Sequence, residues 1–397
     1  MIYDCIIIGA GASGLFCSST FAKPVKGLVL EKSKSPGTKL LMSGNGQCNI
    51  THSGSIKDFV SCYGKNGGKI RSCLYRYNNN SLISFLNENG LNTTVRNDGK
   101  VFPASMNAKD VLNLLLKKSI QNGFKINTNE NIQHISKAPL GWEIISNKNS
   151  YISKSVVIAA GGCSYPATGS DGSIFPVLKK ALKLSSTPLV PALSSIQVID
   201  YPYCELSGIS FENAKISIFQ NQKKTAENVG ALLFTHTDFS GPGILNISKY
   251  AAPENIIEIN YLYPLNYETA FERLKKALHG NKSQTSTIVA SEFSLSKRFV
   301  QNLVKRAGNS AKAISLTLTG EKFTVHSTSG FSKAMVTSGG IELSQINMKT
   351  MEAKKLPGIF IIGEVLDIDG ITGGYNLQFA YSSAKTASDS ILLRSRM

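Results

Sequence analysis

Long apolar runs are missing from this sequence of 397 residues. No stretch approaches the roughly 18 consecutive apolar residues that a membrane-spanning helix needs. The N-terminal apolar stretch is interrupted by Asp4 and Gly9, which is typical of a strand and not of a secretion signal. We therefore expect a cytoplasmic protein without membrane contact.

Closely spaced cysteine pairs are missing too. The sequence has seven cysteines and no C-x-x-C pattern, which disfavours a redox-active disulfide and a zinc site. The odd number favours reduced thiols, and we expect no metal. The cysteines are Cys5, Cys17, Cys48, Cys62, Cys73, Cys163 and Cys204.

Acidic residues and arginines are scarce relative to lysines. Forty-three Lys and Arg against 26 Asp and Glu give a formal net charge of +17, yet only eight of the basic residues are arginines. The charge raises nucleic acid as a partner, but the scattered lysines without an arginine-rich tract disfavour it. We expect a small-molecule substrate, attraction of anionic cofactors or substrates, and a monomer or homodimer. The length predicts two or three domains, each with its own core.

The first 31 residues carry the strongest pattern. An apolar run, Cys5–Ile8, leads into Gly9-Ala10-Gly11-Ala12-Ser13-Gly14 and then into a helical stretch, Gly14–Ala22. In this order the first glycine permits a tight turn, the second lets backbone approach a pyrophosphate and the third lets helix and strand pack closely. Glu31 follows at about the 20-residue distance at which an acid binds a ribose 2′-OH. The pattern predicts a site for a dinucleotide with an unphosphorylated adenosine ribose, and the alternative is a tight turn without a ligand. The predicted cofactor-binding residues are Gly9, Gly11, Ala12, Ser13, Gly14, Glu31 and Lys32.

A second glycine-rich loop lies within Pro36–His52. Gly44 and Gly46 let the backbone come close to a ligand, while short polar side chains supply donors. The alternative is an ordinary surface loop. The residues assigned to the cofactor here are Lys39, Leu40, Ser43, Gly44, Asn45, Cys48 and Asn49.

Periodicity predicts helices over Ser81–Asn89 and Asn107–Asn122, with a hairpin at Arg96–Pro103 between them. Short strands then lead into Ser155–Gly162, which is typical of a buried parallel strand whose small terminal residues let backbone approach the cofactor again. The predicted short strands are Phe124–Ile126, Ile132–Ile135, Trp142–Ile145 and Tyr151–Ile152, and the predicted cofactor residues are Ile132, Ala160, Gly161, Gly162 and Tyr165.

Pro188 and Pro191 mark a break in composition. Strands and turns continue from Leu193 to about Pro264, residues 266–308 have helical spacing, and strands are predicted again at Ile314–Thr319 and Glu321–His326. The middle third therefore reads as a β domain with a helical insert.

The last forty residues return to nucleotide-fold chemistry. A strand at Ile359–Ile362 ends at Gly363 and Glu364, and a helix at Leu377–Leu392 opens with glycines, so that it presents bare N–H groups and a positive dipole end. A C-terminal strand that rejoins an N-terminal glycine-loop fold is typical of two-part flavin domains and predicts FAD. The predicted residues are Gly363, Glu364, Asp369, Gly373, Gly374, Tyr375 and Asn376.

Three stretches together resemble one family. They are Lys39–Asn49, Ser164–Gly169 and Gly363–Asn376, and they are similar to the BaiN/RdsA-type flavoproteins, often labelled NAD(P)/FAD-dependent oxidoreductases or aminoacetone-oxidase-like. The resemblance covers the whole chain. It implies an α/β fold with a glutathione-reductase-like Rossmann FAD domain formed by both chain ends, and an inserted β-barrel-like domain carrying a helical subdomain. The corresponding ranges are 1–190 and 333–397 for the FAD domain, 191–265 and 310–332 for the barrel-like domain, and 266–309 for the helical insert.

The sequence departs from this family at two positions. Gln47 stands where the family commonly has Arg, and His52 where it commonly has Asn; the segment after Gly169 is also shortened. An arginine at position 47 could contact flavin or an anionic substrate, so these changes concern the substrate class.

The leading hypothesis is an FAD-dependent oxidoreductase that moves a hydride between flavin and a small molecule, the redox chemistry being the cofactor's. No second G-x-G-x-x-G follows a strand, so NAD(P)H either visits the flavin transiently or is replaced by a reducing substrate with oxygen as acceptor. The middle domain, Leu193–His326, is expected to cover the flavin. The alternatives are a flavin-dependent RNA-modifying or RNA-binding protein and a flavin-binding regulator.

Single residues have two interpretations each. His236 is a proton carrier or a hydrogen-bonded structural histidine. Cys48 and Cys163 are nucleophiles or small packing residues, the second being favoured. Tyr165 and Tyr375 border the flavin or pack on their neighbours. No catalytic acid or base is assigned from the sequence.

Overall fold

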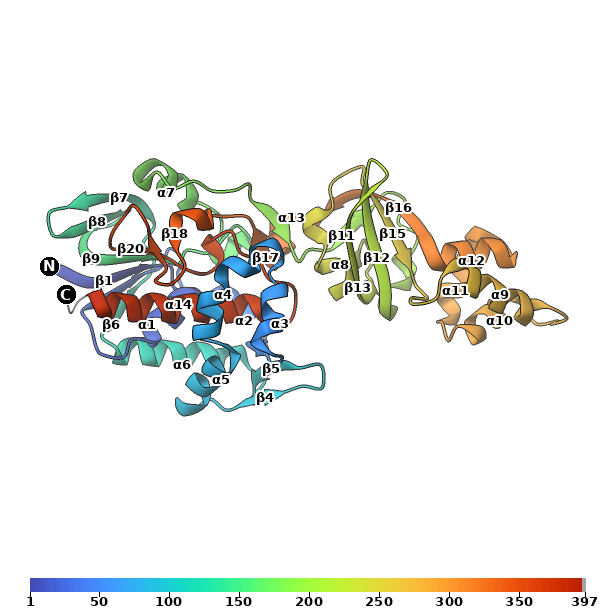
Figure 1. Cartoon of the computed structure of the whole chain (residues 1–397), viewed down its shortest axis with the longest axis horizontal. Coiled ribbons are helices and arrows are strands. Elements are labelled where there is room, and N and C mark those ends of the chain that lie inside the picture. The colour runs from blue at the N-terminus through green and yellow to red at the C-terminus, as the bar shows by residue number, and fades with distance from the viewer. Residues whose placement is uncertain (395–397) are drawn as a thin grey trace. The chain divides into compact units, whose positions relative to one another are not determined.

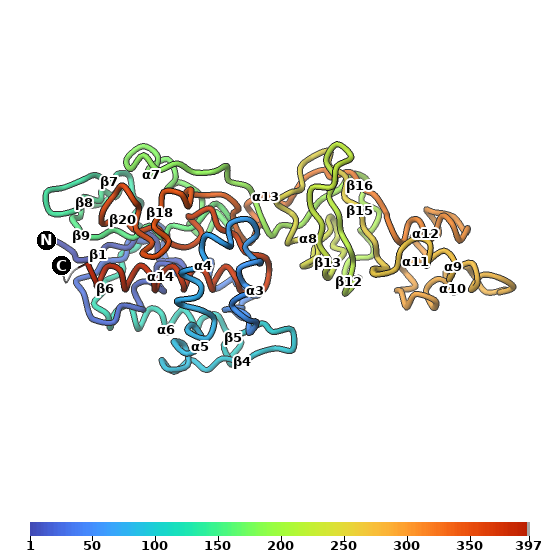
Figure 2. The backbone as a smooth tube through the Cα atoms, viewed as in Figure 1, coloured from blue at the N-terminus to red at the C-terminus, as the bar shows by residue number. Residues whose placement is uncertain are grey.

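The computed structural model describes residues 1–394 and divides into two compact units. Unit 1 consists of Met1–Val190 and Val336–Met397, and unit 2 of Pro191–Met335. The backbone trace leaves unit 1 once and returns to it once (Figure 2), and the short strands β10 (Val190–Ala192) and β17 (Val336–Ser338) lie at these two crossings. No helix in the described range combines the length and hydropathy that crossing a membrane would require.

Unit 1 is built on a nine-stranded sheet, whose central strands run in the order β20-β9-β1-β2-β6 and are all parallel. Buried apolar residues occupy both faces of β2, of β20 and of the second halves of β1 and β9, as expected for a sheet covered on both sides. The mixed α/β Rossmann fold that the two chain ends predict is therefore confirmed. The parallel strands are β1 (Ile2–Ile8), β2 (Gly27–Leu30), β6 (Phe124–Asn127), β9 (Ser150–Ile158) and β20 (Ile359–Ile361), and antiparallel additions are β7 (Ile132–Ala138), β8 (Gly141–Ser146), β18 (Ile346–Asn347) and β19 (Glu352–Ala353).

The strand order reverses at β1. The strands β2 and β6 continue the sheet on one side, and β9 and β20 on the other. The carboxyl ends of β1 and β9 adjoin, because the Ala159 N–H donates to the Ile8 carbonyl at 2.8 Å. Such a reversal point is where open α/β sheets bind ligands.

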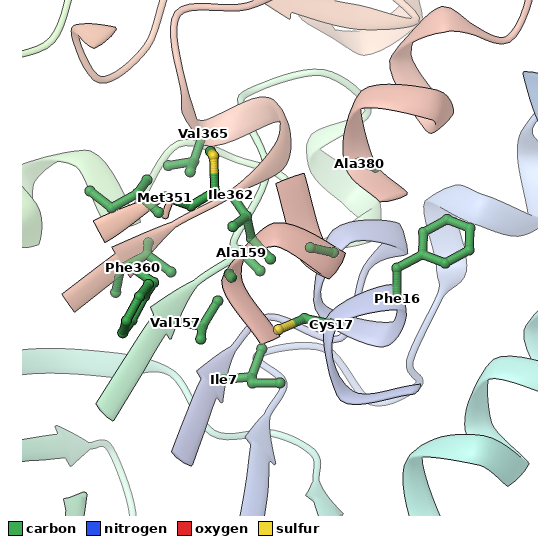
Figure 3. Close-up of a cluster of buried hydrophobic side chains, with 14 of the residues drawn as sticks. Ile7, Phe16, Cys17, Val157, Ala159, Met351, Phe360, Ile362, Val365 and Ala380 are labelled. Atoms are coloured by element: carbon green, nitrogen blue, oxygen red, sulfur yellow. The ribbon is translucent and has the colours of Figure 1, made fainter. Parts of the chain in front are cut away.

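Helices α1 (Ala12–Ser19), α6 (Ala108–Gln121) and α14 (Tyr375–Arg394) lie along one side of this sheet (Figure 1). All but the first residue of α1 are buried, so its small residues are the reason it fits between its neighbours. Figure 3 shows Ile7, Val157 and Phe360 from three adjacent parallel strands meeting in the core, and all three are at most 1% exposed. The first and last segments of the chain therefore share one core.

The remaining elements of unit 1 include the predicted hairpin, which is confirmed as β4 (Thr93–Val95) and β5 (Lys100–Pro103). The helices predicted at Ser81–Asn89 and Asn107–Asn122 are confirmed as α5 (Asn79–Glu88) and α6. Four short helices were not predicted from the sequence, although α4 (Gly67–Arg76) and α7 (Ile174–Leu182) bury residues at helical spacing. The other two are α2 (Thr38–Met42) and α3 (Ile56–Ser61), and the small strand β3 (Thr51–His52) pairs with β5.

Unit 2 contains a closed six-stranded barrel in the order β11-β14-β13-β12-β15-β16, closed by antiparallel pairing of β16 with β11. The predicted inserted β-barrel is therefore confirmed. Aromatic rings fill its interior, with Tyr203 stacked on Phe234 at a centroid distance of 4.2 Å. The strands are β11 (Ile196–Val198), β12 (Ser210–Gln220), β13 (Lys223–Phe234), β14 (Phe239–Ser240), β15 (Ile256–Asn260) and β16 (Glu321–Thr328), with the short helix α8 (Pro242–Leu245) against them.

Four helices are inserted between β15 and β16, namely α9 (Tyr267–Leu278), α10 (Thr285–Glu292), α11 (Lys297–Ala307) and α12 (Ala311–Gly320). The strand predicted at Ile314–Thr319 is wrong, because this segment lies within α12. The Ser310 hydroxyl caps the helix by accepting from the Ala313 N–H at 3.2 Å. Ile314 and Leu318, four residues apart and both fully buried, place one helical face in the core and outweigh the β-branched composition.

A buried carboxylate joins the helices to the barrel. Glu321 opens β16, is 8% exposed, and accepts hydrogen bonds from the Tyr203 hydroxyl and, at 2.6 Å, from the Tyr261 hydroxyl. Arg306 of α11 pairs with its other oxygen at 2.7 Å. Burial, with the Glu321 charge next, raises the pKa of Tyr203 far above its ordinary value. The two phenols therefore remain donors.

Candidate cofactor site

The glycine loop lies at the carboxyl end of β1 and enters α1. At Gly9, where φ is +102°, a Cβ atom would lie 2.6 Å from the Ala159 carbonyl oxygen, and at Gly14 it would lie 1.9 Å from the Gly9 carbonyl oxygen. Packing within the protein therefore requires these two glycines. At Gly11, by contrast, no atom of the described residues lies within 4 Å of the added Cβ. The open space at Gly11 lies before the N-terminus of α1, where the sequence pattern predicts a phosphate.

Glu31 lies against this loop. Its side chain is 8% exposed, and its two oxygens accept from the Ala10 N–H at 2.6 Å and the Ser33 N–H at 2.7 Å. The acid thus holds the loop in place and keeps lone pairs for a further donor. The neighbouring Lys32 instead pairs with Asp171 and donates to the Ser173 hydroxyl at 2.9 Å.

A polar cluster joins three predicted stretches. The Lys39 ammonium lies 2.7 Å from Glu364 and 2.6 Å from the Ser164 hydroxyl. Ser164 donates to Glu364 at 2.8 Å, and so does the Thr337 N–H. Lys39 and Glu364 are about a quarter exposed, at 24% and 22%, so the cluster borders solvent-accessible space. Ser164 begins the family-like segment Ser164–Gly169, and neither Ser164 nor Thr337 was among the predicted cofactor residues.

The loop that contains Ser43, Gly44, Asn45 and Asn49 leads into β3, which contacts the C-terminal glycine turn. A Cβ atom at Gly374 would lie 2.7 Å from the Thr51 backbone, and Thr51 donates to Gln378 of α14 at 2.7 Å. Asn376 closes the turn by pairing with both backbone groups of Gly370, at 2.8 and 2.9 Å. The Asp369 carboxylate accepts from Ser338 at 2.8 Å. Hydrogen bonds within the protein therefore already use some of the donors and acceptors of these residues.

Other predicted residues are buried in the core of unit 1. Leu40, Cys48 and Ile132 are 3%, 0% and 7% exposed, and Tyr375, at 9%, stacks on His52 with a centroid distance of 5.7 Å. Burial raises the pKa of Cys48 to about 11, so its thiol stays neutral. Burial, followed by the Glu364 and Asp171 charges, also raises the pKa of Cys163. Both thiols are better suited to packing than to nucleophilic attack.

The chain after β9 holds a residue that sequence analysis missed. Ser170 is 7% exposed, and its hydroxyl finds no hydrogen-bond partner among residues 1–394. A Cβ atom at Gly161 would lie 2.9 Å from this hydroxyl, so Ser170 borders the segment Ala160–Gly162. Tyr165, in the left-handed region at φ +54°, opens the turn that leads to it. An unpaired buried hydroxyl is costly unless a ligand satisfies it.

His236 lies in unit 2 and is exposed. It forms no hydrogen bond with any described residue, so its interpretation as a hydrogen-bonded structural histidine is wrong. Nor do residues 1–394 contain three or more His, Cys, Asp or Glu side chains arranged to hold a metal ion.

These features fit a dinucleotide cofactor. A Cβ at Gly11 would meet no neighbouring atom, Glu31 can accept from a hydroxyl, and the buried Ser170 hydroxyl has no partner among the described residues. The individual contacts assigned to the cofactor stay predictions. What this arrangement can do chemically is bind a redox cofactor and orient it.

The chain is similar to known proteins both in sequence and in structure. The family described as "HI0933-like protein Rossmann domain" matches residues 3–390. A ribosomal RNA dihydrouridine synthase of Haemophilus influenzae is 31% identical over 412 residues, covering 97% of this chain and 98% of the relative. A 3-dehydro-bile acid delta(4,6)-reductase of Clostridium scindens is 27% identical, covering 96% and 97%. In structure, the chain resembles a 3-ketosteroid delta1-dehydrogenase from Sterolibacterium denitrificans with a TM-score of 0.52 at 11% identity, covering 99% of this chain and 100% of that one.

Proposed function

The chain belongs to the HI0933-like family of FAD-dependent oxidoreductases, and on that premise we propose that it reduces an activated carbon–carbon double bond of its substrate. Dihydrouridine differs from uridine by one reduced ring double bond, and delta(4,6) denotes double-bond positions in a steroid. The names of the two relatives therefore share this type of reaction. The observation that carries the proposal is that both chain ends build one parallel sheet within unit 1, where β1 and β20 flank β9.

FAD, when bound, supplies the hydride chemistry of the reaction. The protein's part is to bind and orient it. The N-terminus of α1 with Gly11 would hold the pyrophosphate, Glu31 would hold the adenosine ribose, and Ser170 would supply a further hydroxyl. The Lys39–Glu364 pair would place a fixed positive and a fixed negative group beside the cofactor.

We propose NADH or NADPH as the source of electrons. Neither a second glycine loop after a strand nor a pocket for a 2′-phosphate is evident in the sequence, so the nicotinamide dinucleotide would bind transiently and with little preference between the two forms. The proposed compartment is the cytoplasm, which the seven free cysteines of the described chain support.

Two measurements test this function. The purified protein should be yellow and release FAD on denaturation, as mass spectrometry would identify. Anaerobic stopped-flow at the flavin absorbance band should then show reduction by NADH and NADPH with weak saturation, and reoxidation by a conjugated enone or by uridine-containing RNA. Isolation of NAD alone would contradict the cofactor assignment. Reoxidation by oxygen alone would contradict the reductase assignment.

A second candidate is the same reaction on a uridine within RNA. The formal charge of +17 favours a polyanionic substrate, and one relative is named for ribosomal RNA. Incubation of the protein, NADPH and unmodified ribosomal RNA, followed by nucleoside mass spectrometry for dihydrouridine, distinguishes this candidate from a small-molecule reductase.

A further inference from the structure

Arg96 is a restrained surface cation. It begins the turn between β4 and β5, and its guanidinium donates from Nη2 to the Gln47 side-chain oxygen at 2.6 Å. The same group lies over the Phe102 ring at 4.0 Å and reaches the Met106 sulfur at 3.7 Å. Although the residue is exposed, these contacts fix the orientation of its planar group.

Asp98 is a nearby carboxylate that does not pair with the guanidinium: hydrogen bonds from Lys100, followed by the Lys100 and Arg96 charges, lower the pKa of Asp98. Among the other arginines of the described chain, those at positions 273, 306 and 394 pair with glutamates, whereas those at positions 71, 76 and 298 form no ion pair within that range. Arg96 forms no ion pair within residues 1–394, and the nearby Asp98 is bound to Lys100 instead. The Nε–H and both Nη1–H donors of Arg96 also have no acceptor in that range. A preoriented cation with free donors is suited to an oxyanion.

The position of Arg96 connects it to the cofactor site. Gln47 belongs to the glycine-rich loop at 43–49, and the Ala108 N–H anchors this loop through the Gly46 carbonyl at 2.8 Å. Arg96 therefore brings a guanidinium to this loop from the β4–β5 hairpin.

We propose that Arg96 anchors a phosphate group of a ligand that arrives from solvent, as distinct from the bound FAD. The inference rests on the proposed function, which supplies two ligands with phosphates: a nicotinamide dinucleotide and an RNA substrate. Exposure of Arg96 makes it accessible to an incoming ligand, and arginine is preferred for phosphate because of its fork of donors.

The test uses full-length, FAD-loaded protein and the Arg96→Gln variant. The two ligands share phosphate groups, so inorganic pyrophosphate serves as the first probe. Its binding is measured by the shift that it causes in the melting temperature of the protein. Reduction by NADH and NADPH as a function of concentration, and binding of a fluorescent single-stranded RNA over a range of salt, distinguish the two sources. We expect a roughly tenfold loss of affinity for the ligand that Arg96 holds, and, if that ligand is RNA, a log–log salt slope lower by about 0.7.

Controls separate a specific contact from loss of one charge. Arg71→Gln removes an arginine that lies over Tyr75 at 5.0 Å in the same unit, and Lys100→Gln removes the lysine of the same hairpin. The exchange Gln47→Arg with Arg96→Gln returns a guanidinium to the loop and should restore affinity.

The proposal would be overturned if all of these single variants lost ligand affinity to the same extent. It would also be overturned if Arg96→Gln behaved as the wild type does with all three probes, or if this variant lost FAD and not the phosphate ligand. If the wild type responds to pyrophosphate through Arg96 but shows no reduction by a nicotinamide and no RNA binding, the proposed function fails while the phosphate anchor stands.

Discussion

The clearest test of the cofactor site is a pair of glycine-to-alanine changes in one loop. Gly11→Ala places a methyl group where residues 1–394 leave open space, in an extended conformation with φ −78° and ψ −170° that alanine adopts. Gly11 is the N-cap of α1, and the cost of an alanine at an N-cap and the gain from a less flexible unfolded chain are each about 0.5–1 kcal/mol and nearly cancel. The stability of the apoprotein should therefore change by less than about 1 kcal/mol.

FAD affinity should respond differently. A methyl group at Gly11 would occupy the space through which backbone N–H groups reach the pyrophosphate. Loss of one hydrogen bond to a charged group costs about 1.5–3 kcal/mol, which corresponds to a roughly 10- to 150-fold weaker affinity. Fluorescence titration of the apoprotein with FAD would measure this loss.

Gly14→Ala is the matched control. Its methyl group would lie 1.9 Å from the Gly9 carbonyl oxygen, so the backbone would have to move. Overpacking of this kind costs about 1–3 kcal/mol or more and should lower the melting temperature of the apoprotein. The reasoning is refuted if Gly11→Ala binds FAD as the wild type does, or if it destabilises the apoprotein as much as Gly14→Ala.

Three further changes test the charged contacts. Glu31→Ala should weaken FAD by about 1.5–3 kcal/mol and leave the spectrum of retained flavin unchanged, and unaltered affinity in a folded variant would show that this acid is not at the ribose. Glu321→Gln should lower the stability of unit 2 by about 1.5–3 kcal/mol, the scale for losing a hydrogen bond to a charged group, without changing FAD affinity, as calorimetry and a separate FAD titration would measure; equal melting curves would contradict the buried network. Burial raises the pKa of Asp171, but hydrogen bonds from Lys32 and Ser173 outweigh it and hold the pKa below its ordinary value of 3.8. The stabilisation from that pair is therefore present above pH 3.8 and is lost as the pH falls below it, so Asp171→Asn should flatten the acid limb of the stability–pH curve, and an unchanged limb would exclude the pair as its source.

Much of unit 1 follows from local sequence order. The run from Cys5 to Gly14 specifies a strand, a tight turn and a helix through the order and spacing of its glycines, although the carbonyl that excludes a side chain at Gly9 belongs to the distant Ala159. The separation of Glu31 from the loop then places the acid at the end of the next parallel strand, where the structure finds it bonded to the Ala10 N–H. The strand predicted at Ile314–Thr319 was wrong because β-branched composition is a weak guide when a buried helical face competes with it.

The sequence by itself determined the glycine loop, its acid, the return of the C-terminal strand and the family, because these depend on short spacings and on order along the chain. Only the tertiary structure decided which polar groups meet. Lys39 and Glu364 are 325 residues apart, and Arg96 and Gln47 come from different elements. Ser170 carries no distinguishing pattern, and its unpaired hydroxyl becomes evident only once its surroundings are folded around it. Hydrogen bonding and burial depend on distances in space, which chain spacing does not specify for residues this far apart.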